Sequence, residues 1–330
     1  MTAMKNPVFF PSRRTALVFC AAAMLGVSAG AQTIPKTIRI IVAYPAGGVS
    51  DVVARALADK LSQQLGSAVI IDNRAGASGA IGVDAVAKAQ PDGATLGFAA
   101  ISPLVLSPHL GKVPYDPFKD IAPVASVMYS PVLLLATSAS KSRDFPGLLS
   151  EAKANPGAVR WATSGPASLG HIMLEQLRAA AQVDITHVPY KGGGQQMNDA
   201  LSGQFEILST NAGPVLSAHM QAGKLRALAV GAPARLESLP QVPTLGELGY
   251  GAANLSSLFG VFAPAATPPA LLARYNAEIN KALASPELRA RLTATDNVPT
   301  GGSATDFAKE IASEYESNAR IIKAAGIKAD

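Results

Sequence analysis

Short runs of β-branched and other apolar residues alternate with amphipathic stretches of helical spacing along most of this 330-residue chain. This alternation is typical of α/β folds, in which helices on both faces bury a parallel sheet. Hydrophobic residues make up 48% of the sequence and charged residues 15%, which excludes disordered, collagen-like and coiled-coil chains. The length is sufficient for two lobes of ordinary size. The sequence therefore predicts an α/β fold.

The apolar runs give the positions of the strands. Strands are expected at residues 38–43, 68–72, 95–99, 132–136, 159–163, 185–188, 205–208, 225–230 and 258–263. Helices are expected after the turn at 76–82, at 144–155, 169–181, 195–202 and 214–222, and in the C-terminal stretches around Leu271 and Phe307. A further helix is expected to begin near Ser50, because serine is a preferred N-cap and Asp51 complements the helix dipole.

Residues 1–31 have the three parts of a secretory signal peptide. Positively charged residues precede an apolar stretch at 16–27, and a segment of small residues ends at Ala31, after which cleavage is expected. A transmembrane anchor is the alternative, but it needs about 20 apolar residues. The single cysteine, Cys20, lies in this segment. The mature chain is therefore expected to use no thiol catalyst and no disulfide.

The charge balance of the remaining chain is nearly even. The whole chain has a formal charge of +5, and Lys5, Arg13 and Arg14 lie in the predicted signal peptide. Aromatic residues make up 5% of the sequence, fewer than base-stacking proteins use. The composition thus predicts no nucleic-acid partner. The longest apolar run after the signal, 131–136, has the length of a strand and predicts no second membrane span.

Two turns rich in glycine and serine each follow a predicted strand and open a predicted helix. They are Tyr44-Pro-Ala-Gly-Gly-Val-Ser-Asp51 and Thr163-Ser-Gly-Pro-Ala-Ser-Leu-Gly-His171. The first N–H groups of a helix lack partners inside it, so a helix N-terminus attracts a phosphate or carboxylate. Residues 73–79 form a third turn of this kind. The alternative is that each turn only connects a strand to a helix.

No motif for nucleotides, hydrolysis or metals is complete. Residues 76–82 read G-x-x-G-x-x-G, which differs from the dinucleotide fingerprint, and the G-x-S-x-G elbow fails in its last position. The four histidines lack ligand spacing, so no metal and no cofactor are expected. Alternatives to ligand contact stay open: local packing for His171 and Tyr190, and a dipole-complementing role for Asp51.

Seven short motifs stand in order along the mature chain. They are Tyr44-Pro-Ala-Gly-Gly-Val-Ser-Asp51, Asp72-Asn-Arg-Ala-Gly-Ala-Ser-Gly-Ala-Ile-Gly82, Pro91-Asp-Gly-Ala-Thr-Leu96, Thr163-Ser-Gly165, His187-Val-Pro-Tyr-Lys-Gly-Gly193, Gly223-Lys-Leu-Arg-Ala-Leu-Ala229 and Pro243-Thr-Leu-Gly-Glu247. In this set the chain resembles the extracytoplasmic substrate-binding receptors of tripartite tricarboxylate transporters, the Bug family. The resemblance covers essentially the whole mature chain.

The resemblance implies an α/β periplasmic binding protein of type II, whose chain crosses twice between two lobes. Lobe 1 would comprise residues 32–131 and 251–330, and lobe 2 residues 132–250. Both glycine-rich loops would clamp a ligand carboxylate between the lobes. The implied ligand-binding residues are Tyr44, Ala46, Gly47, Gly48, Val49, Ser50, Asp51, Ala77, Ser78, Ser102, Ser164, Gly165, Pro166, Ala167, Ser168, Tyr190 and Asn211.

One departure from the family pattern lies in the second loop. Relatives usually read Ser-Ser-Gly-x-Gly-Ser/Thr there, whereas this chain has Pro166 and Ala167 at the tip of the loop. A proline has no N–H, so the loop offers one donor fewer.

The implied function is the capture of a small carboxylate and its delivery to inner-membrane transporter subunits by a monomeric periplasmic protein. The expected ligand is a dicarboxylate, a tricarboxylate, an aromatic acid or an acidic amino acid, and no catalytic residue is expected. Two alternatives stay open. One is a ligand-binding partner of a signalling receptor, and the other is an exported serine hydrolase with Ser78 or Ser168 as its nucleophile.

Overall fold

The computed structural model of the chain describes residues 33–191 and 193–327. Ile34–Asp330 form one compact unit, and the predicted signal peptide lies outside the described residues. Within these described ranges, no helix is both long and apolar enough to cross a membrane.

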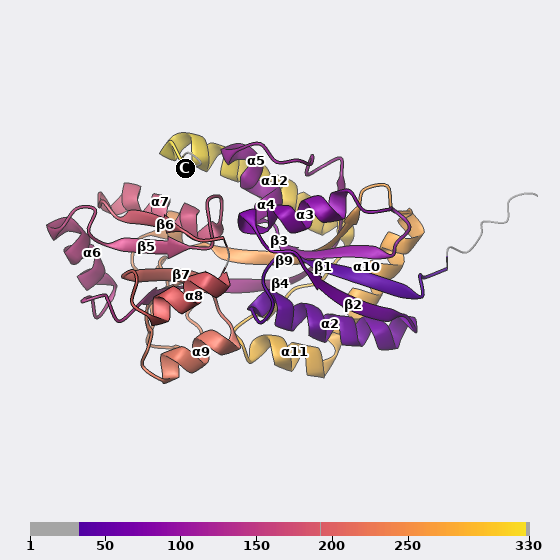
Figure 1. Cartoon of the computed structure of the whole chain (residues 1–330), viewed down its shortest axis with the longest axis horizontal. Coiled ribbons are helices and arrows are strands. Elements are labelled where there is room, and N and C mark those ends of the chain that lie inside the picture. Colours follow the sequence, from indigo (N-terminus) through magenta and orange to yellow (C-terminus); the bar gives the residue numbers. More distant parts are fainter. Residues whose placement is uncertain (1–32, 192, 328–330) are drawn as a thin grey trace, which may run out of the picture. The chain divides into compact units, whose positions relative to one another are not determined.

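The first sheet combines parallel and antiparallel strands (Figure 1). In spatial order its strands are β2 (Ala68–Asn73), β1 (Thr37–Val42), β3 (Thr95–Ala100), β9 (Ser256–Pro264), β4 (Ile121–Ala136) and β10 (Val298–Pro299). β1 runs parallel to both β2 and β3. β9 is antiparallel to β3 and β4, and β10 is antiparallel to β4. The predicted parallel pairing therefore applies to the first three strands only.

The second sheet is built on the C-terminal end of β4. Its other strands are β7 (Ile207–Asn211), β5 (Arg160–Thr163), β6 (Thr186–Pro189) and β8 (Arg226–Gly231). β7, β5 and β6 are parallel to one another, while β7 and β8 flank β4 in antiparallel pairs. β4 pairs with β9 up to Pro131 and with β7 and β8 from Val132 onward. This one strand thus belongs to both sheets.

Helices connect the strands and cover both sheets (Figure 1). The α-helices are α2 (Val49–Leu65), α3 (Ala80–Ala87), α4 (Ser102–Val105), α5 (Ser107–Leu110), α6 (Phe145–Ala154), α7 (Leu169–Ala181), α8 (Gly193–Leu201), α9 (Pro214–Gln221), α10 (Pro269–Ala284), α11 (Pro286–Thr293) and α12 (Ala304–Ala325). Two short 3₁₀-helices are η2 (Ala77–Gly79) and η3 (Gly251–Ala253).

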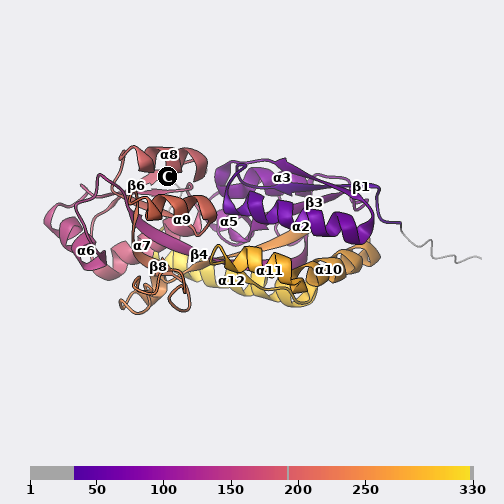
Figure 2. The same cartoon turned by 90° about the horizontal axis from the view of Figure 1, so that it is seen from below.

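The core of the first sheet consists of two clusters, one on each face. α2, α10 and α11 cover the face on which Ile40 lies, and α3, α4 and α12 cover the face of Ile41. Neighbouring residues of a strand point to opposite faces, which explains why these two isoleucines join different clusters. Figure 2 shows α10 and α11 beside α2.

The second sheet is covered in the same way. α6 and α7 pack on the face of Leu134, and α8 and α9 pack on the face of Leu133. α7, α8 and α9 each follow a strand of this sheet, as α2 follows β1 in the first. The helix N-termini therefore lie at strand ends, which is where α/β proteins bind ligands.

Most predicted elements are confirmed, and the differences have local causes. β4 begins at Ile121 rather than at Val132, because its first part, with Pro123, lacks a β-branched run but pairs with β9. α2 begins at Val49 with Gly48 as its N-cap, so Ser50 is a helical residue and not the cap. The boundaries of the two lobes stay a prediction.

Candidate functional site

A cavity of about 370 Å³ lies where four helices begin. Its lining includes Gly48 and Val49 at α2, Ser168 and Leu169 at α7, Gly193 and Gly194 at α8, and Gly213 at α9. Among the described residues that line it, none is Asp, Glu, Lys or Arg. In the described lining, therefore, no carboxylate side chain competes with a bound anion for the N–H groups of the helix ends. The cavity favours an anion.

The first rim of the cavity is the loop between β1 and α2. The first helical hydrogen bond runs from the Val52 N–H to the Gly48 carbonyl oxygen (3.1 Å). The N–H groups of residues 49–51 therefore have no carbonyl acceptor within the helix. Gly47, Gly48, Val49 and Ser50 line the cavity. The side chain of Ser50 is buried, so its hydroxyl adds a polar group close to these N–H donors.

Asp51 supports this rim from behind and does not line the cavity. Its carboxylate accepts hydrogen bonds from the Gly47 N–H, from Arg55 Nε and from Asn73 Nδ2, each at 3.0 Å. Burial raises the pKa of Asp51, but the bonds from Arg55, Gly47 and Asn73 outweigh it and hold the pKa below its usual value. The structure thus favours the local role for Asp51 that the sequence left open.

We expect Asp51→Asn to lower the free energy of unfolding by about 1–3 kcal/mol at pH 7, because the hydrogen bonds to a buried charged group are lost. The folded-state pKa is depressed, so this stabilisation exists above the unfolded pKa and disappears as pH falls through the folded value. The difference between the two proteins is therefore expected to shrink below about pH 4. Urea unfolding at pH 7 and pH 3 measures it, and exposed Asp59→Asn on the same helix is the control. A difference that does not change with pH contradicts this role.

The second rim is the N-terminus of α7. Ser168 is the N-cap, and its hydroxyl accepts a hydrogen bond from the His171 N–H (3.3 Å). The N–H groups of Leu169 and Gly170 lie in the first turn, and both residues line the cavity. Gly170 packs closely on β7, since a Cβ there would lie 2.3 Å from Ser209 Oγ. Ser209 in turn accepts a hydrogen bond from the buried indole of Trp161 (2.9 Å).

The third glycine-rich turn, residues 73–79, touches the loop before α7 beside the cavity. Ser78 Oγ donates a hydrogen bond to the Pro166 carbonyl oxygen (2.6 Å). Gly165 has φ +131°, and a Cβ at this position would lie 2.8 Å from Ser78 Oγ and 2.9 Å from the Tyr190 carbonyl oxygen. Glycine is thus required at position 165 for both its conformation and its close contacts. The tip residue Pro166 still takes part in hydrogen bonding, through its carbonyl group.

The structure brings most of the predicted ligand-binding residues to this one cavity. Those that line it are Tyr44, Ala46, Gly47, Gly48, Val49, Ser50, Ser78, Ser102, Ser164, Ser168 and Asn211. Those that do not are Asp51, Ala77, Gly165, Pro166, Ala167 and Tyr190. Tyr190 instead donates a hydrogen bond to Asp199 (2.8 Å) and packs edge-on against Phe205. Whether the lining residues hold a ligand stays a prediction.

The structure gives His171 the local packing role that the sequence left open, and it places His219 at the cavity. His171 is buried, its ring stacks on that of His187 with centroids 4.2 Å apart, and it does not line the cavity. His219, which no motif singled out, does line it from α9.

Burial raises the pKa of Tyr44, so this phenol stays neutral at physiological pH.

Sequence reasoning missed the wall formed by α8 and α9. This wall contributes Gly193, Gly194, Met197, Asn198, Leu201, Gly213, Val215, Leu216 and His219. The glycine run before α8 and the amphipathic spacing of that helix were the available signals. Neither shows which face of a helix borders a cavity.

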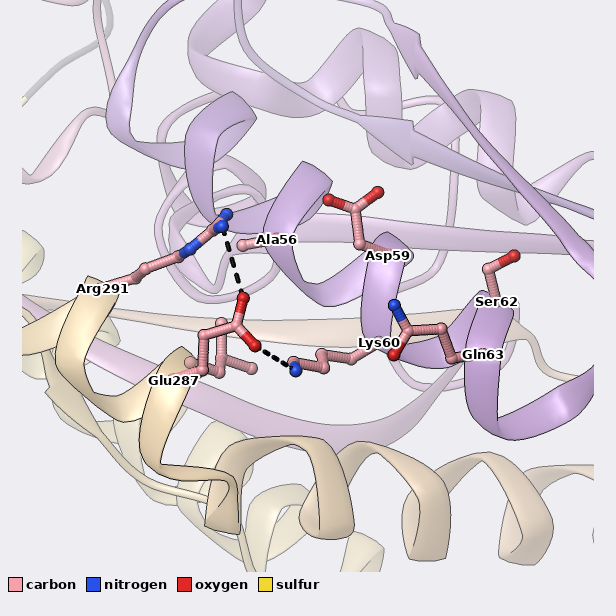
Figure 3. Close-up of a pocket in the computed structure, with 8 residues that line it drawn as sticks. Ala56, Asp59, Lys60, Ser62, Gln63, Glu287 and Arg291 are labelled. Carbon is pink, nitrogen blue, oxygen red and sulfur yellow. Dashed lines mark hydrogen bonds and ion pairs between the residues drawn. The ribbon is translucent and has the colours of Figure 1, made fainter.

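A second cavity of about 310 Å³ lies between α2 and α11 (Figure 3). Glu287 lies between Lys60 and Arg291 and forms ion pairs with both. Asp59 adds another carboxylate to the lining. Lys60 and Arg291 already form ion pairs with Glu287. This cavity is therefore less favourable for binding an anion than the cavity at the helix N-termini. Within the described part of the chain, no group of three or more His, Cys, Asp or Glu is arranged to hold a metal ion.

Most of the chain is similar to the proteins of one family. The profile of the tripartite tricarboxylate transporter family receptor matches residues 53–327. Protein BugT of Bordetella pertussis is 36% identical over 316 residues, which cover 94% of this chain and 96% of BugT.

Solved structures agree with this match. R. palustris Rpa4515 with adipate is 30% identical with a TM-score of 0.83, covering 88% of this chain and 98% of that protein. MatC from Rhodopseudomonas palustris with bound malate is 28% identical with a TM-score of 0.80, covering 87% and 98%. These likenesses confirm the predicted α/β fold of a two-lobed, type II-like periplasmic binding protein.

Proposed function

Since this chain belongs to the tripartite tricarboxylate transporter receptor family, we propose that it is a periplasmic receptor that binds a small organic carboxylate. The observation that carries the proposal is the opening of the α2 and α7 N-termini into one cavity whose described lining has no charged carboxylate or cation. Adipate and malate, found with two relatives, are carboxylates of this kind. Export by the predicted signal peptide, the division into lobes 32–131 with 251–330 and 132–250, and a monomeric state belong to the same proposal.

Neutral donors supply the affinity in this account. A carboxylate loses hydration on entering the cavity, and each charge-assisted hydrogen bond offsets about 1.5–3 kcal/mol of that loss. The proposed donors are the N–H groups of Val49 and Ser50 on one rim and of Leu169 and Gly170 on the other. Ser102, a buried residue of the lining, adds a hydroxyl. A ligand that needs both rims binds only when the two loops are close together.

The serine hydrolase alternative finds little support at the two candidate nucleophiles. Ser78 Oγ donates a hydrogen bond to the Pro166 carbonyl oxygen, and Ser168 Oγ caps α7. These hydrogen bonds join each serine to a main-chain group, whereas the hydroxyl of an activated serine donates to a base. We therefore propose a binding protein without catalytic activity.

A thermal-shift screen of carboxylates tests the proposal. The library contains mono-, di- and tricarboxylates, aromatic acids and amino acids. A ligand present at 100 times its Kd adds about 2.7 kcal/mol to the free energy of unfolding, and this raises Tm measurably. Native mass spectrometry of freshly purified protein is expected to detect a co-purified acid. No stabilisation by any acid and no retained ligand would count against the receptor.

Delivery to inner-membrane transporter subunits is the last part of the proposal, and partnership with a signalling receptor is its alternative. Both predict that the ligand-bound protein contacts a membrane protein. Cross-linking in membranes, with and without the stabilising acid, followed by identification of the captured partner, distinguishes them. Capture of a permease subunit supports transport, and capture of a sensor kinase supports signalling.

A further inference from the structure

The N-termini of α8 and α9 offer N–H groups as the two rims do, but the wall that these helices form beyond their first residues differs chemically from the rims. It presents four apolar side chains to the cavity: Met197, Leu201, Val215 and Leu216. Met197 and Leu201 are four residues apart and so lie on one face of α8. They pack, half-buried, against the core that contains Leu216. The apolar surface is thus fixed by packing and remains partly open to the cavity.

This apolar surface extends away from the helix N-termini. Gly194 and Leu201 both line the cavity, and at 1.5 Å per helical residue they are about 10 Å apart along α8. His219 lies at a similar distance from Gly213 along α9, again with both residues in the lining. The cavity therefore has a polar end at the helix starts and an elongated apolar part beside α8 and α9.

A second carboxylate would have no cation to meet in that apolar part. Asn198 and His219 are the polar side chains that α8 and α9 contribute to the lining, and the described lining includes no Lys or Arg. Burial of a carboxylate without a cation or several donors is unfavourable, whereas a CH₂ or ring carbon gains free energy in the same place.

This inference rests on the proposed function as a carboxylate receptor. We infer that the cavity binds a monocarboxylic acid with an apolar body more tightly than a dicarboxylate of the same length. One acid group binds at the N-termini of α2 and α7. The hydrocarbon part lies along Met197, Leu201 and Val215. This specificity comes from the side chains of α8 and α9 and not from the N–H groups of the two rims.

Two acids of equal chain length test the inference. Hexanoate and adipate differ only in the group at the far end, and benzoate with terephthalate forms a second pair. Calorimetric titration is expected to give at least about tenfold tighter binding of each monoacid. Adipate binding as tightly as hexanoate, or more tightly, overturns the inference but leaves the receptor function in place. Binding of none of these acids, together with a negative carboxylate screen, overturns both.

A variant can reverse the preference. Val215 is 50% exposed and lines the cavity, so Val215→Lys introduces a cation at the apolar wall with little risk to folding. We expect it to strengthen adipate binding by about tenfold and to weaken hexanoate binding. Val298→Lys is the matched control, because Val298 is 57% exposed and does not line the cavity. Equal changes in both variants contradict the inference.

Discussion

The variant Gly48→Val is expected to weaken carboxylate binding by roughly 10- to 100-fold, because an isopropyl group replaces a hydrogen atom in the lining of the cavity. Gly48 has φ −76° and ψ 171°, a conformation that valine accepts. A Cβ there would lie 3.6 Å from the Pro45 carbonyl oxygen, which is ordinary contact. The added bulk therefore faces the cavity, and Tm is expected to stay within a few degrees of wild type.

Gly111→Val is the control for this change. Gly111 ends α5, its φ is −173°, and nothing lies within 4 Å of a Cβ there. It should change neither binding nor Tm. Calorimetric titration with the acid that stabilises wild type gives the binding constants. Parallel losses of affinity and stability in Gly48→Val would mean that the loop is only a structural connection.

Trp161→Ala is expected to lower the free energy of unfolding by about 3–5 kcal/mol. Trp161 is fully buried in the core beneath α6 and α7, and its Nε1–H donates to Ser209 Oγ. The substitution leaves a large cavity and also removes the donor that fixes Ser209 against Gly170. The second rim should therefore loosen as well, and carboxylate affinity should fall.

Urea unfolding of Trp161→Ala measures the first effect, with Phe118→Ala as the control. Phe118 is 51% exposed, so its loss should cost less than about 1 kcal/mol. Trp161→Phe keeps most of the volume but not the N–H, and it should lie between the two. A cost below about 1 kcal/mol for Trp161→Ala contradicts the packing described for this core.

Local sequence was sufficient to predict the βα units and their glycine-rich turns. Tyr44 to Asp51 and Thr163 to His171 each connect a strand to the helix that follows it, so the local residue pattern indicates them. The convergence of both turns on one cavity was an expectation from the family resemblance, and the structure brings them together.

Other features depended on residues distant in the chain. The first part of β4 has Pro123 and no regular alternation, and it becomes a strand because β9 pairs with it. The motif that contains Asp51 predicted contact with a ligand, but Arg55 and Asn73 donate hydrogen bonds to its carboxylate. The apolar wall of the cavity depends on the faces that α8 and α9 turn toward β4 and β7, which helical spacing alone does not fix.

Amide chemical shifts give the most direct test of where the acid group binds. In a titration of ¹⁵N-labelled protein with hexanoate, or with the acid that stabilises it most, the amides of Val49, Ser50, Leu169 and Gly170 are expected to shift together with one Kd. The chemical shifts of the α11 amides around Glu287, beside the other cavity, are expected not to change. Saturable shifts confined to the α11 region, with the α2 and α7 N-termini unchanged, would contradict the account.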